Sequence, residues 1–373
     1  MGVKNSMPKS HVSRFKPAEF QSKALGWYEK NQRVLPWRVR GNKKTDPYKV
    51  WLSEIMLQQT TVAAVIPYFL KFLEKWPDVT SLANANDSEV MVAWAGLGYY
   101  ARARNLLKCA RVITNDYKGQ FPDTAHELKK LPGIGPYTAA AISTIGFGNP
   151  ATVMDGNIER IVSRIFAIET PLPLGKKDIR QHCDFIFKDL ENFNKQEIKS
   201  FPQALMDIGS EICTPKASQC HLCPLTNMCQ AYKLGGQEKF PVRAPKKPTP
   251  LRKGEVFWIQ DKSGRIIVEK RSDNRMLGGM IGLPTTDWDL KERKTIVKDY
   301  NFKEKLKNLQ KIGVVYHVFT HFKLELDVYE VTMPDFKNVL KCFPEYVPYD
   351  GNLVDIGFPT LFQKVARFVQ KNL

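Results

Sequence analysis

The N-terminal part of the chain has the spacing of apolar side chains that is typical of α-helices. Apolar residues recur three and four positions apart in Val50–Phe69 and again in Leu106–Ile113. Few windows alternate apolar and polar residues as half-buried strands do. Turn-forming residues separate these stretches, for example at Trp76–Asp78 and Phe121–Asp123. The pattern predicts an all-α domain over residues 15–234.

After residue 254 the pattern changes to that of β-strands. Short runs rich in β-branched and aromatic residues are separated by turn signals, and the last run alternates apolar and charged residues. The predicted strands are Glu255–Gln260, Ile266–Lys270, Lys311–Val315 and Lys323–Glu330. A turn at Asp261–Gly264 would join the first two as a hairpin. We therefore expect a second domain of mixed α and β structure over residues 255–373.

Residues 235–254 join the two patterns and have a composition of their own. Between Lys239 and Lys253 basic residues are interleaved with prolines, and no acidic residue occurs. Proline disfavours both helices and interior strands, so the segment is expected to be a semi-extended basic linker. It could follow a polyanion, lie along the other domain, or remain a solvated spacer.

Composition and charge narrow the class of protein. The chain has 373 residues, 43% of them hydrophobic, which is enough for two packed domains and excludes a disordered chain. Its 56 Lys+Arg against 38 Asp+Glu give a formal net charge of +18, which favours a polyanionic partner. No run approaches the roughly 18 apolar residues of a membrane span, and the basic N-terminus has no apolar signal core. We expect a soluble, cytoplasmic protein without membrane contact.

The strongest local signal is a group of four cysteines within residues 213–229. They are Cys213, Cys220, Cys223 and Cys229. Thiolates this close in sequence can converge on one site, and they select zinc or an iron–sulfur cluster. Zinc sites more often use two Cys-x-x-Cys pairs than this uneven spacing. His221 lies inside the loop but is not needed as a ligand when four cysteines are available. The spacing predicts a structural metal centre.

A second motif, Leu131–Thr138, contains glycines two residues apart. Gly133 and Gly135 permit a tight turn whose backbone N–H groups, with the start of the following helix, could hold a phosphate. An ordinary turn between two helices would use the same residues.

Two carboxylates complete the candidate chemistry. Asp155 precedes a predicted helix, where it could act as an N-cap, as a catalytic group, or as both. Glu54 lies on a predicted helix one turn from Val50, Trp51 and Gln58. Burial among apolar neighbours would raise the pKa of Glu54 and keep a proton available for donation. A surface glutamate is the alternative, because Glu is rarely buried unpaired.

These motifs occur in an order that resembles the adenine DNA glycosylase (MutY) family of the endonuclease III, or helix-hairpin-helix, superfamily. Asp155 follows Gly135 by 20 residues, a spacing that matches the superfamily's catalytic aspartate. The motifs that resemble this family in particular are Leu35–Arg38, Ser53–Thr60, Gly96–Tyr100, Leu277–Pro284 and His317–Phe322. The last two resemble its Nudix-like, lesion-reading module.

The resemblance implies a fold and a cofactor. The expected fold is a mainly α helix-hairpin-helix glycosylase domain with an iron–sulfur cluster loop, followed by an α+β Nudix-like domain. The four cysteines would hold a 4Fe-4S cluster. The expected partner is double-stranded DNA with adenine opposite 8-oxoguanine or guanine, bound by a monomer in the bacterial cytoplasm, at the nucleoid. No protein partner is indicated.

The resemblance also implies a reaction, the hydrolysis of the bond between the mispaired adenine and its sugar in base excision repair. The adenine would first be turned out of the duplex. Protonated Glu54 would then donate a proton to N7 of adenine, and ionised Asp155 would stabilise the electron-poor sugar, directly or through a covalent intermediate. Tyr137 and Asn157 would position these groups. Bifunctional members carry a lysine where this chain has Tyr137, so base removal without strand cleavage is expected.

Further residues follow from the family pattern. The expected adenine pocket consists of Trp37, Arg38 and Leu57. The expected contacts with DNA and the lesion are Gln59, Thr60, Leu97, Tyr99, Gly133, Gly135, Phe319, Thr320 and His321. Among these, Gln59 would fill the hole left by the adenine and Tyr99 would wedge beside the lesion. Bacterial relatives commonly have serine where Thr320 stands, which leaves a hydroxyl donor in place.

Two other functions are compatible with parts of the pattern. An endonuclease III-like glycosylase with lyase activity would share the fold, and a DNA-binding protein without catalysis would share the cluster and the helix-hairpin-helix. Tyr137 argues against the first, and the presence of Glu54 and Asp155 argues against the second. Residues 278–300 lack the acidic helix of a Nudix hydrolase, so no pyrophosphatase activity is expected. His317 and His321 could equally be packed residues of the sheet.

Overall fold

The computed structural model describes residues 15–41, 44–245, 248–286, 288, 306, 308–353 and 355–372. The chain divides into two compact units, one formed by Met1–Ala83 with Lys108–Lys246 and the other by Asn84–Leu107 with Lys247–Leu373. The predicted first domain differs from this division at Asn84–Leu107. That segment contacts the sheet unit through Arg104, which donates to the carbonyl of Gly278, a contact that sequence periodicity does not reveal.

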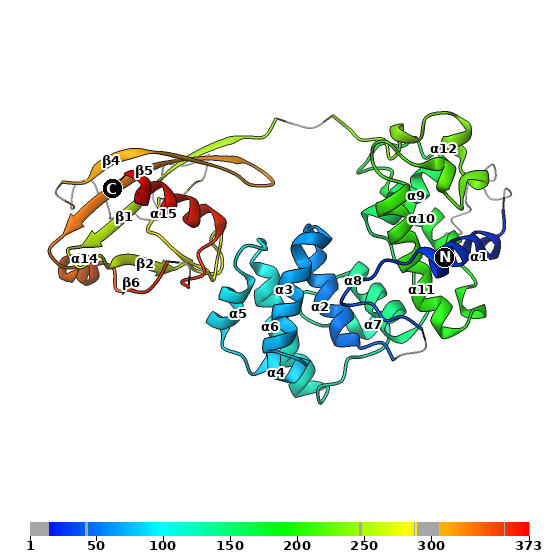
Figure 1. The fold of residues 1–373 in the computed structure, drawn as a ribbon, viewed down its shortest axis with the longest axis horizontal. Helices are drawn as coiled ribbons and strands as arrows, with labels where there is room; N and C mark the ends of the chain where they lie inside the picture. The colour runs from blue at the N-terminus through cyan, green and yellow to red at the C-terminus, as the bar shows by residue number, and fades with distance from the viewer. Residues whose placement is uncertain are drawn as a thin grey trace, which may run out of the picture. The chain divides into compact units, whose positions relative to one another are not determined.

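The first unit is helical, as predicted, and among the described residues the first strand begins at Leu251 (Figure 1). Its α-helices are α1 (Pro17–Asn31), α2 (Pro47–Leu57), α3 (Val62–Lys75), α4 (Val79–Ala83), α6 (Ala101–Asp116, which begins in the second unit), α7 (Ala125–Leu128), α8 (Pro136–Ala141), α9 (Gly156–Phe166), α10 (Lys176–Ile186), α11 (Lys195–Asp207) and α12 (Gln230–Lys233). The π-helices are η1 (Ile142–Phe147) and η3 (Ile208–Ile212), and the 3-10 helices are η2 (Leu190–Asn192), η4 (Cys220–Leu222), η5 (Thr226–Met228) and η6 (Gln237–Lys239). Among the described residues, no helix is long and apolar enough to cross a membrane.

Capping residues divide the long helical stretch that begins at Val50. Asp46 caps α2 by accepting from the backbone N–H of Tyr48, and Pro47 occupies its first turn. After α2 ends, Gln59 adopts a left-handed backbone with φ of +58°, which a continuing helix does not allow. Thr61 then caps α3 by accepting from Ala64. The apolar periodicity thus continues through a break that exposes Gln59.

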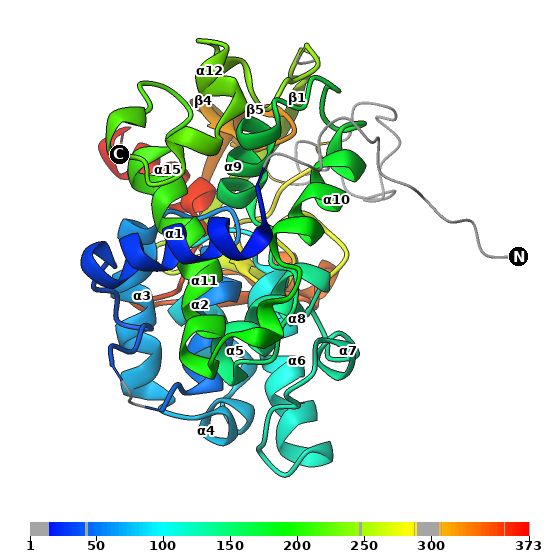
Figure 2. The ribbon, with the colours of Figure 1, turned by 90° about the vertical axis from the view of Figure 1, so that its right-hand side faces the viewer.

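The helices of the first unit form two groups. In Figure 1, α1, α9, α10, α11 and α12 gather in one group, while α2, α3, α7 and α8 lie in another. Helix α1 packs across α11, as Figure 2 also shows. Contacts of α11 and α2 with the π-helix η1 join the groups. The junction places the N-terminus of α9 opposite α2 and α8, which carry the other candidate residues.

The second unit contains a mixed six-stranded sheet in the order β3-β2-β1-β5-β4, with β6 pairing to β2. Its strands are β1 (Leu251–Asp261), β2 (Ile266–Lys270), β3 (Ile281–Gly282), β4 (Gln310–Val318), β5 (Lys323–Met333) and β6 (Tyr346–Tyr349), and its helices are α5 (Asp87–Trp94), α14 (Lys337–Cys342) and α15 (Thr360–Asn372). Strands β1 and β5 are parallel, whereas the other pairs are antiparallel. The four strands predicted from sequence and the turn between the first two are confirmed.

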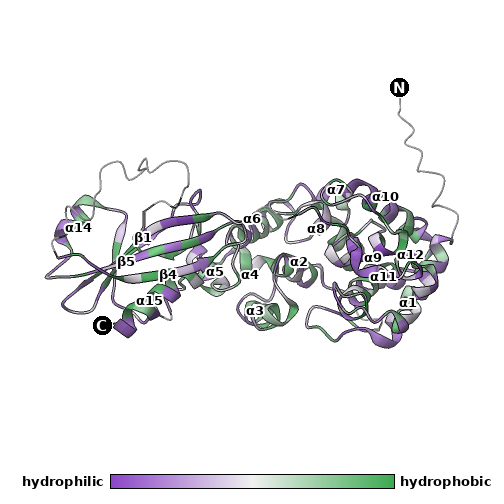
Figure 3. Ribbon diagram, turned by 90° about the horizontal axis from the view of Figure 1, so that it is seen from above, coloured by the Kyte–Doolittle hydropathy of each residue, from purple (hydrophilic) through white to green (hydrophobic). Residues whose placement is uncertain are grey.

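Both faces of the sheet carry an apolar core. Buried side chains alternate along β5, and Figure 3 shows hydrophobic and hydrophilic segments alternating along this strand. One core contains Val256, Leu326 and Phe362 of α15, and the other contains Ile259 and Phe336. A parallel strand pair with helices on both faces is consistent with the predicted α+β class.

The predicted linker does not stay free of the units over its whole length. Strand β1 begins at Leu251, inside the segment, because Leu251 pairs with Lys323 in the sheet. Near the other end, the carbonyl of Val242 accepts from the backbone N–H of Leu172 at 2.8 Å. Lys246 and Lys247 lie outside the described residues. Part of this basic segment therefore lies along the first unit, one of the alternatives that its composition left open.

Candidate active site

Glu54 is buried in the second turn of α2, so the surface alternative is wrong. Only 7% of the residue is exposed, and the Tyr137 hydroxyl donates to its Oε2 at 2.7 Å. Burial raises the pKa of Glu54 to about 7; the hydrogen bond from Tyr137 opposes this rise and the charge of Asp155 supports it. A carboxyl with this pKa is divided between its protonated and ionised forms near neutral pH. It can therefore act as a general acid.

Asp155 caps α9 and also faces the same pocket, so its two possible roles coexist. Its Oδ1 accepts from the backbone N–H of Ile158 at 2.7 Å, and its Oδ2 accepts from Asn157 Nδ2 at 2.9 Å. Burial raises the pKa of Asp155, while these hydrogen bonds favour its ionised form. The helix N-terminus favours a negative charge at this position as well.

Arg160 connects the Asp155 turn to the π-helix η3. Its Nη2 donates to Asn157 Oδ1 at 2.8 Å and to the carbonyl of Gly209, and its Nε donates to the carbonyl of Cys213 at 2.6 Å. Gly209 permits this packing because a Cβ there would lie 2.6 Å from Cβ of Asn157. Asn157 is thus held between Asp155 and Arg160, which fixes the amide that hydrogen-bonds to the carboxylate.

One pocket of about 780 Å³ brings these side chains together. The predicted residues that line it are Trp37, Arg38, Glu54, Leu57, Gln59, Thr60, Tyr137, Asp155 and Asn157. Residues that the sequence did not predict also line it: Arg33, Leu35, Val50, Ser53, Gln58, Thr61, Val62, Ile145, Gly156, Gln203, Met206 and Ser210. The last three come from α11 and η3, which carry no recognisable motif. Every predicted catalytic and adenine-pocket residue therefore lies on one concave surface of the first unit.

The adenine-pocket candidates are held by packing and charge. Trp37 is buried, and its ring packs edge-on against Phe69 with the centroids 5.2 Å apart. Arg38 forms a two-point ion pair with Asp207, with Nη1 to Oδ2 at 2.5 Å and Nη2 to Oδ1 at 2.9 Å. Arg33 pairs with the same carboxylate at 2.6 Å. No sequence pattern indicates a role for Asp207, because its partners lie far away along the chain.

The candidate DNA contacts of the first unit lie in two exposed turns. Gln59 is exposed in the turn after α2, and Thr60 beside it is half-buried. Gly133 has φ of +73° in the turn between α7 and α8, and Gly135 is the N-cap of α8 with no atom near the place of a Cβ. This backbone fits the predicted helix-hairpin-helix turn, in which glycine relieves the steric strain.

The remaining candidates belong to the second unit. The turn between β4 and β5 consists of Phe319, Thr320 and His321, of which Thr320 and His321 are exposed. The ring of Phe319 stacks on that of Phe322, with the ring centroids 4.7 Å apart. Tyr99 is 41% exposed, has φ of +49°, and its hydroxyl contacts that of Thr320. Leu97 is only 6% exposed, and its predicted contact with DNA stays a prediction. Part of the segment 278–300, which lacks the acidic helix of a Nudix hydrolase, lies outside the described residues, namely 287 and 289–300.

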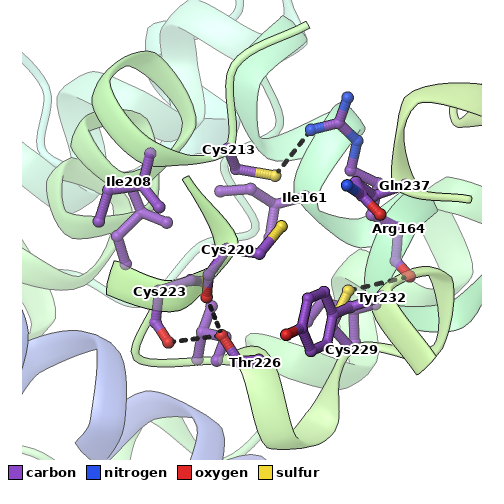
Figure 4. A pocket seen from close by; sticks show the side chains of 13 residues that line it. Ile161, Arg164, Ile208, Cys213, Cys220, Cys223, Thr226, Cys229, Tyr232 and Gln237 are labelled. Atoms are coloured by element: carbon purple, nitrogen blue, oxygen red, sulfur yellow. Dashed lines mark hydrogen bonds between the residues drawn. The ribbon is translucent and has the colours of Figure 1, made fainter. Parts of the chain in front are cut away.

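The four cysteines line a second pocket of the first unit, shown in Figure 4. Arg164, which is buried, donates from Nη1 to the sulfur of Cys213 at 3.2 Å and to the carbonyl of Thr214 at 2.8 Å. Within the described ranges, no three Cys, His, Asp or Glu side chains come close enough to hold a single metal ion. Four thiols around one cavity are nevertheless suitable ligands for a metal centre bound by thiolates.

Comparisons with known proteins find a matching family model for each of the two units. The family model described as "HhH-GPD superfamily base excision DNA repair protein" matches residues 52–187, and the NUDIX domain model matches residues 255–367. A protein of Buchnera aphidicola subsp. Schizaphis graminum (strain Sg) described as "Adenine DNA glycosylase" is 35% identical, with 93% of this chain and 97% of the relative aligned. The human protein of the same description is 30% identical, with 84% of this chain and 67% of the human protein aligned.

A solved structure supports the fold of the helical unit. The structure of a thermostable thymine-DNA glycosylase aligns with a TM-score of 0.50 and 28% identity. It covers 58% of this chain, and 97% of that protein is aligned. The similarity therefore reaches nearly the whole of that glycosylase.

Proposed function

This chain belongs to the adenine DNA glycosylase family, and from that premise we propose that it removes adenine mispaired with 8-oxoguanine or guanine in duplex DNA. Removal of the base initiates base excision repair, the process named by the matching family model. The observation that carries the proposal is the pocket in which Glu54, Tyr137 and Asp155 converge. A protein that only docked on DNA would need none of these three side chains.

The geometry supports a division of labour between the two carboxyls. The adenine, once turned out of the duplex, enters the pocket at a cost of a few kcal/mol for unstacking. Glu54 donates its proton to N7, which converts the base into a neutral leaving group. Ionised Asp155 stabilises the positive charge that develops on the sugar, and a water molecule then adds to the same carbon and loses a proton, which leaves the abasic sugar. Tyr137 holds Glu54, and Asn157 holds Asp155.

Tyr137 also limits the reaction to base removal. A phenol cannot form the imine with the sugar that leads to strand cleavage, and the lyases of the superfamily use a lysine amine for this step. Burial and the nearby carboxylates raise the pKa of Tyr137 far above its usual value, so the hydroxyl remains a hydrogen-bond donor. Enzymes of this kind leave an abasic site in an unbroken strand.

Cys213, Cys220, Cys223 and Cys229 are proposed to hold a 4Fe-4S cluster. The support comes from their placement around one cavity and from the softness of thiolate ligands. When bound, the cluster would crosslink residues 213–229 and so stabilise the loop. Arg164 would lie beside it as a hydrogen-bond donor to the Cys213 sulfur.

The second unit is proposed to inspect the base opposite the adenine. Thr320 and His321 at the exposed turn, with Phe319 behind them, offer hydroxyl and imidazole groups for this contact. Tyr99 is proposed as the wedge beside the lesion. Action as a monomer at the bacterial nucleoid stays a prediction.

A single-turnover reaction tests the proposed function. Purified protein is mixed with labelled duplex that contains adenine opposite 8-oxoguanine, and the products are resolved on a gel with and without hot alkali. We expect strand breaks only after alkali, because the abasic site survives until base treatment. The control duplex carries cytosine opposite 8-oxoguanine. Breaks without alkali would overturn the argument from Tyr137, and no breaks under either condition would favour a protein that only binds DNA.

The pH dependence of adenine release follows from the two carboxyls. Glu54 acts in its protonated form, so the rate should fall as pH rises above about 7, roughly tenfold per pH unit. Asp155 acts in its ionised form, so the rate should also fall as pH drops through the raised pKa of Asp155. Single-turnover rates over a pH series measure both limbs. A rate that rose steadily through neutral pH would contradict the role of Glu54 as an acid.

A further inference from the structure

Asp207, the last residue of α11, is a buried carboxylate that the catalytic steps above do not use. We propose that Asp207 is a positioning residue that holds Arg38 and Arg33 at the wall of the pocket and offsets their positive charge beside Glu54. The inference deepens the proposed function and rests on it, because its main consequence is a change in adenine release.

The carboxylate of Asp207 is completely enclosed, and both of its oxygens are used. Its side chain has no exposed surface. Oδ1 accepts from Arg33 Nε at 2.6 Å and from Arg38 Nη2 at 2.9 Å. Oδ2 accepts from Arg38 Nη1 at 2.5 Å and from the backbone N–H of Arg33 at 3.2 Å. A single negative charge therefore serves two guanidinium groups, both of which reach it from the segment between α1 and α2.

The pairing fixes the plane of the Arg38 guanidinium. A two-point contact allows little rotation, unlike a single hydrogen bond. It uses two of the five N–H donors of the group, which leaves three for other acceptors. The Arg38 side chain is 7% exposed, lines the pocket, and lies over the ring of Tyr28 at 5.8 Å. Arg38 is thus presented to the pocket in one orientation, as recognition of a flat heterocycle requires.

A local break in helix geometry aims Asp207 at these arginines. The regular α11 ends at Asp207, and the π-helix η3 begins at the next residue. A π-helical turn inserts an extra residue and rotates the preceding side chains relative to the following ones. Ser210 Oγ donates to the Asp207 carbonyl at 3.2 Å within this turn, and Ser210 also lines the pocket.

The charge of Asp207 matters for Glu54 because Arg38 acts on that carboxyl. Among the described residues, the charged and titratable groups that act on Glu54 are Tyr137 from α8, Asp155 before α9, and Arg38 from the segment before α2. Arg38 lowers the pKa of Glu54 through its positive charge. Asp207 places a negative charge against Arg38 and so offsets part of this effect. Without Asp207, the buried guanidinium would favour ionised Glu54 and so remove the proton that the reaction needs.

The substitution Asp207→Asn tests the inference, since it keeps the size of the side chain and removes its charge. We expect the basic limb of the pH–rate profile to move down by about one pH unit, the lower end of the effect of a nearby charge. Above the midpoint, the rate should then fall roughly tenfold relative to wild type. A stability defect alone would lower the rate at all pH values and leave the midpoint where it was.

Two further variants separate charge from folding. Asp207→Glu keeps the negative charge and should leave the midpoint near that of wild type. In the double variant Asp207→Asn with Arg38→Met, the cation that acts on Glu54 is gone, so the midpoint should return upward although the rate stays reduced. An unmoved midpoint in Asp207→Asn, or a moved one that the double variant fails to restore, would overturn the inference.

A titration without turnover distinguishes this inference from the proposed function. Carbon-13 spectra of protein labelled at glutamate carboxyls report the pKa of Glu54, whose signal is identified by its loss in Glu54→Gln. A lowered Glu54 midpoint in Asp207→Asn would support the inference even if no duplex were cleaved. If wild-type protein released no adenine but the Glu54 midpoint were still lowered in Asp207→Asn, the proposed function would be wrong and the inference about Asp207 would stand. An unchanged midpoint in this titration would overturn the inference whatever the activity.

Discussion

Replacement of Glu54 with glutamine should abolish measurable adenine release, with a fall in the single-turnover rate of roughly 10²- to 10⁴-fold. Glutamine fills the same space and can still accept the hydrogen bond from Tyr137, which Glu54 accepts at 2.7 Å. It cannot supply a proton to the leaving base. Because Glu54 is buried and has a pKa of about 7, removal of its ionisable group should not weaken folding.

The measurement pairs base release with binding of the same lesion duplex. Fluorescence anisotropy should give an affinity near that of wild type, and circular dichroism should give a melting temperature no lower than that of wild type. Glu74→Gln is a matched control, since Glu74 is an exposed residue of α3 outside the pocket. Its activity should equal that of wild type. If binding fell in parallel with activity in Glu54→Gln, a role in folding would be indicated instead.

Asp155→Asn should have an effect of similar size, a loss of roughly 10²- to 10³-fold in the single-turnover rate. Asparagine removes the negative charge that stabilises the sugar. It also turns one carboxylate oxygen into an N–H₂ donor that faces the donor Nδ2 of Asn157. The helix cap survives, because asparagine is as good an N-cap as aspartate and can still accept from Ile158.

The cap provides the control for this variant. Asp46→Asn makes the same change at the N-cap of α2, where Asp46 accepts from Tyr48 at 2.9 Å outside the pocket. Both variants should melt within a few degrees of wild type, since the expected loss in stability is below about 1 kcal/mol. Only Asp155→Asn should lose activity. Equal activity in the two variants would show that Asp155 acts as a helix cap and not in the reaction.

Much of the fold could be predicted because its signals are local. Helical spacing, strand alternation and turn residues each occupy a few neighbouring positions, and four predicted strands lie within β1, β2, β4 and β5. The prediction of the fold was least accurate where packing between distant residues determines which unit a segment joins. The segment Asn84–Leu107 lies with the sheet unit although its own pattern is helical, and no local pattern predicts that Leu97 is buried there.

The sequence by itself determined the chemical groups of the candidate site: two carboxyls, a tyrosine in place of a lysine, and four closely spaced thiols. Only the tertiary structure decided their environments. Tyr137 lies 83 positions from Glu54, and Asp207 lies 174 positions from Arg33. The burial that raises the pKa of Glu54 and the ion pairs that hold Arg38 come from residues distant in the chain. Spacing along a sequence records neighbours within a few turns, whereas solvation and charge depend on everything that packs around a group.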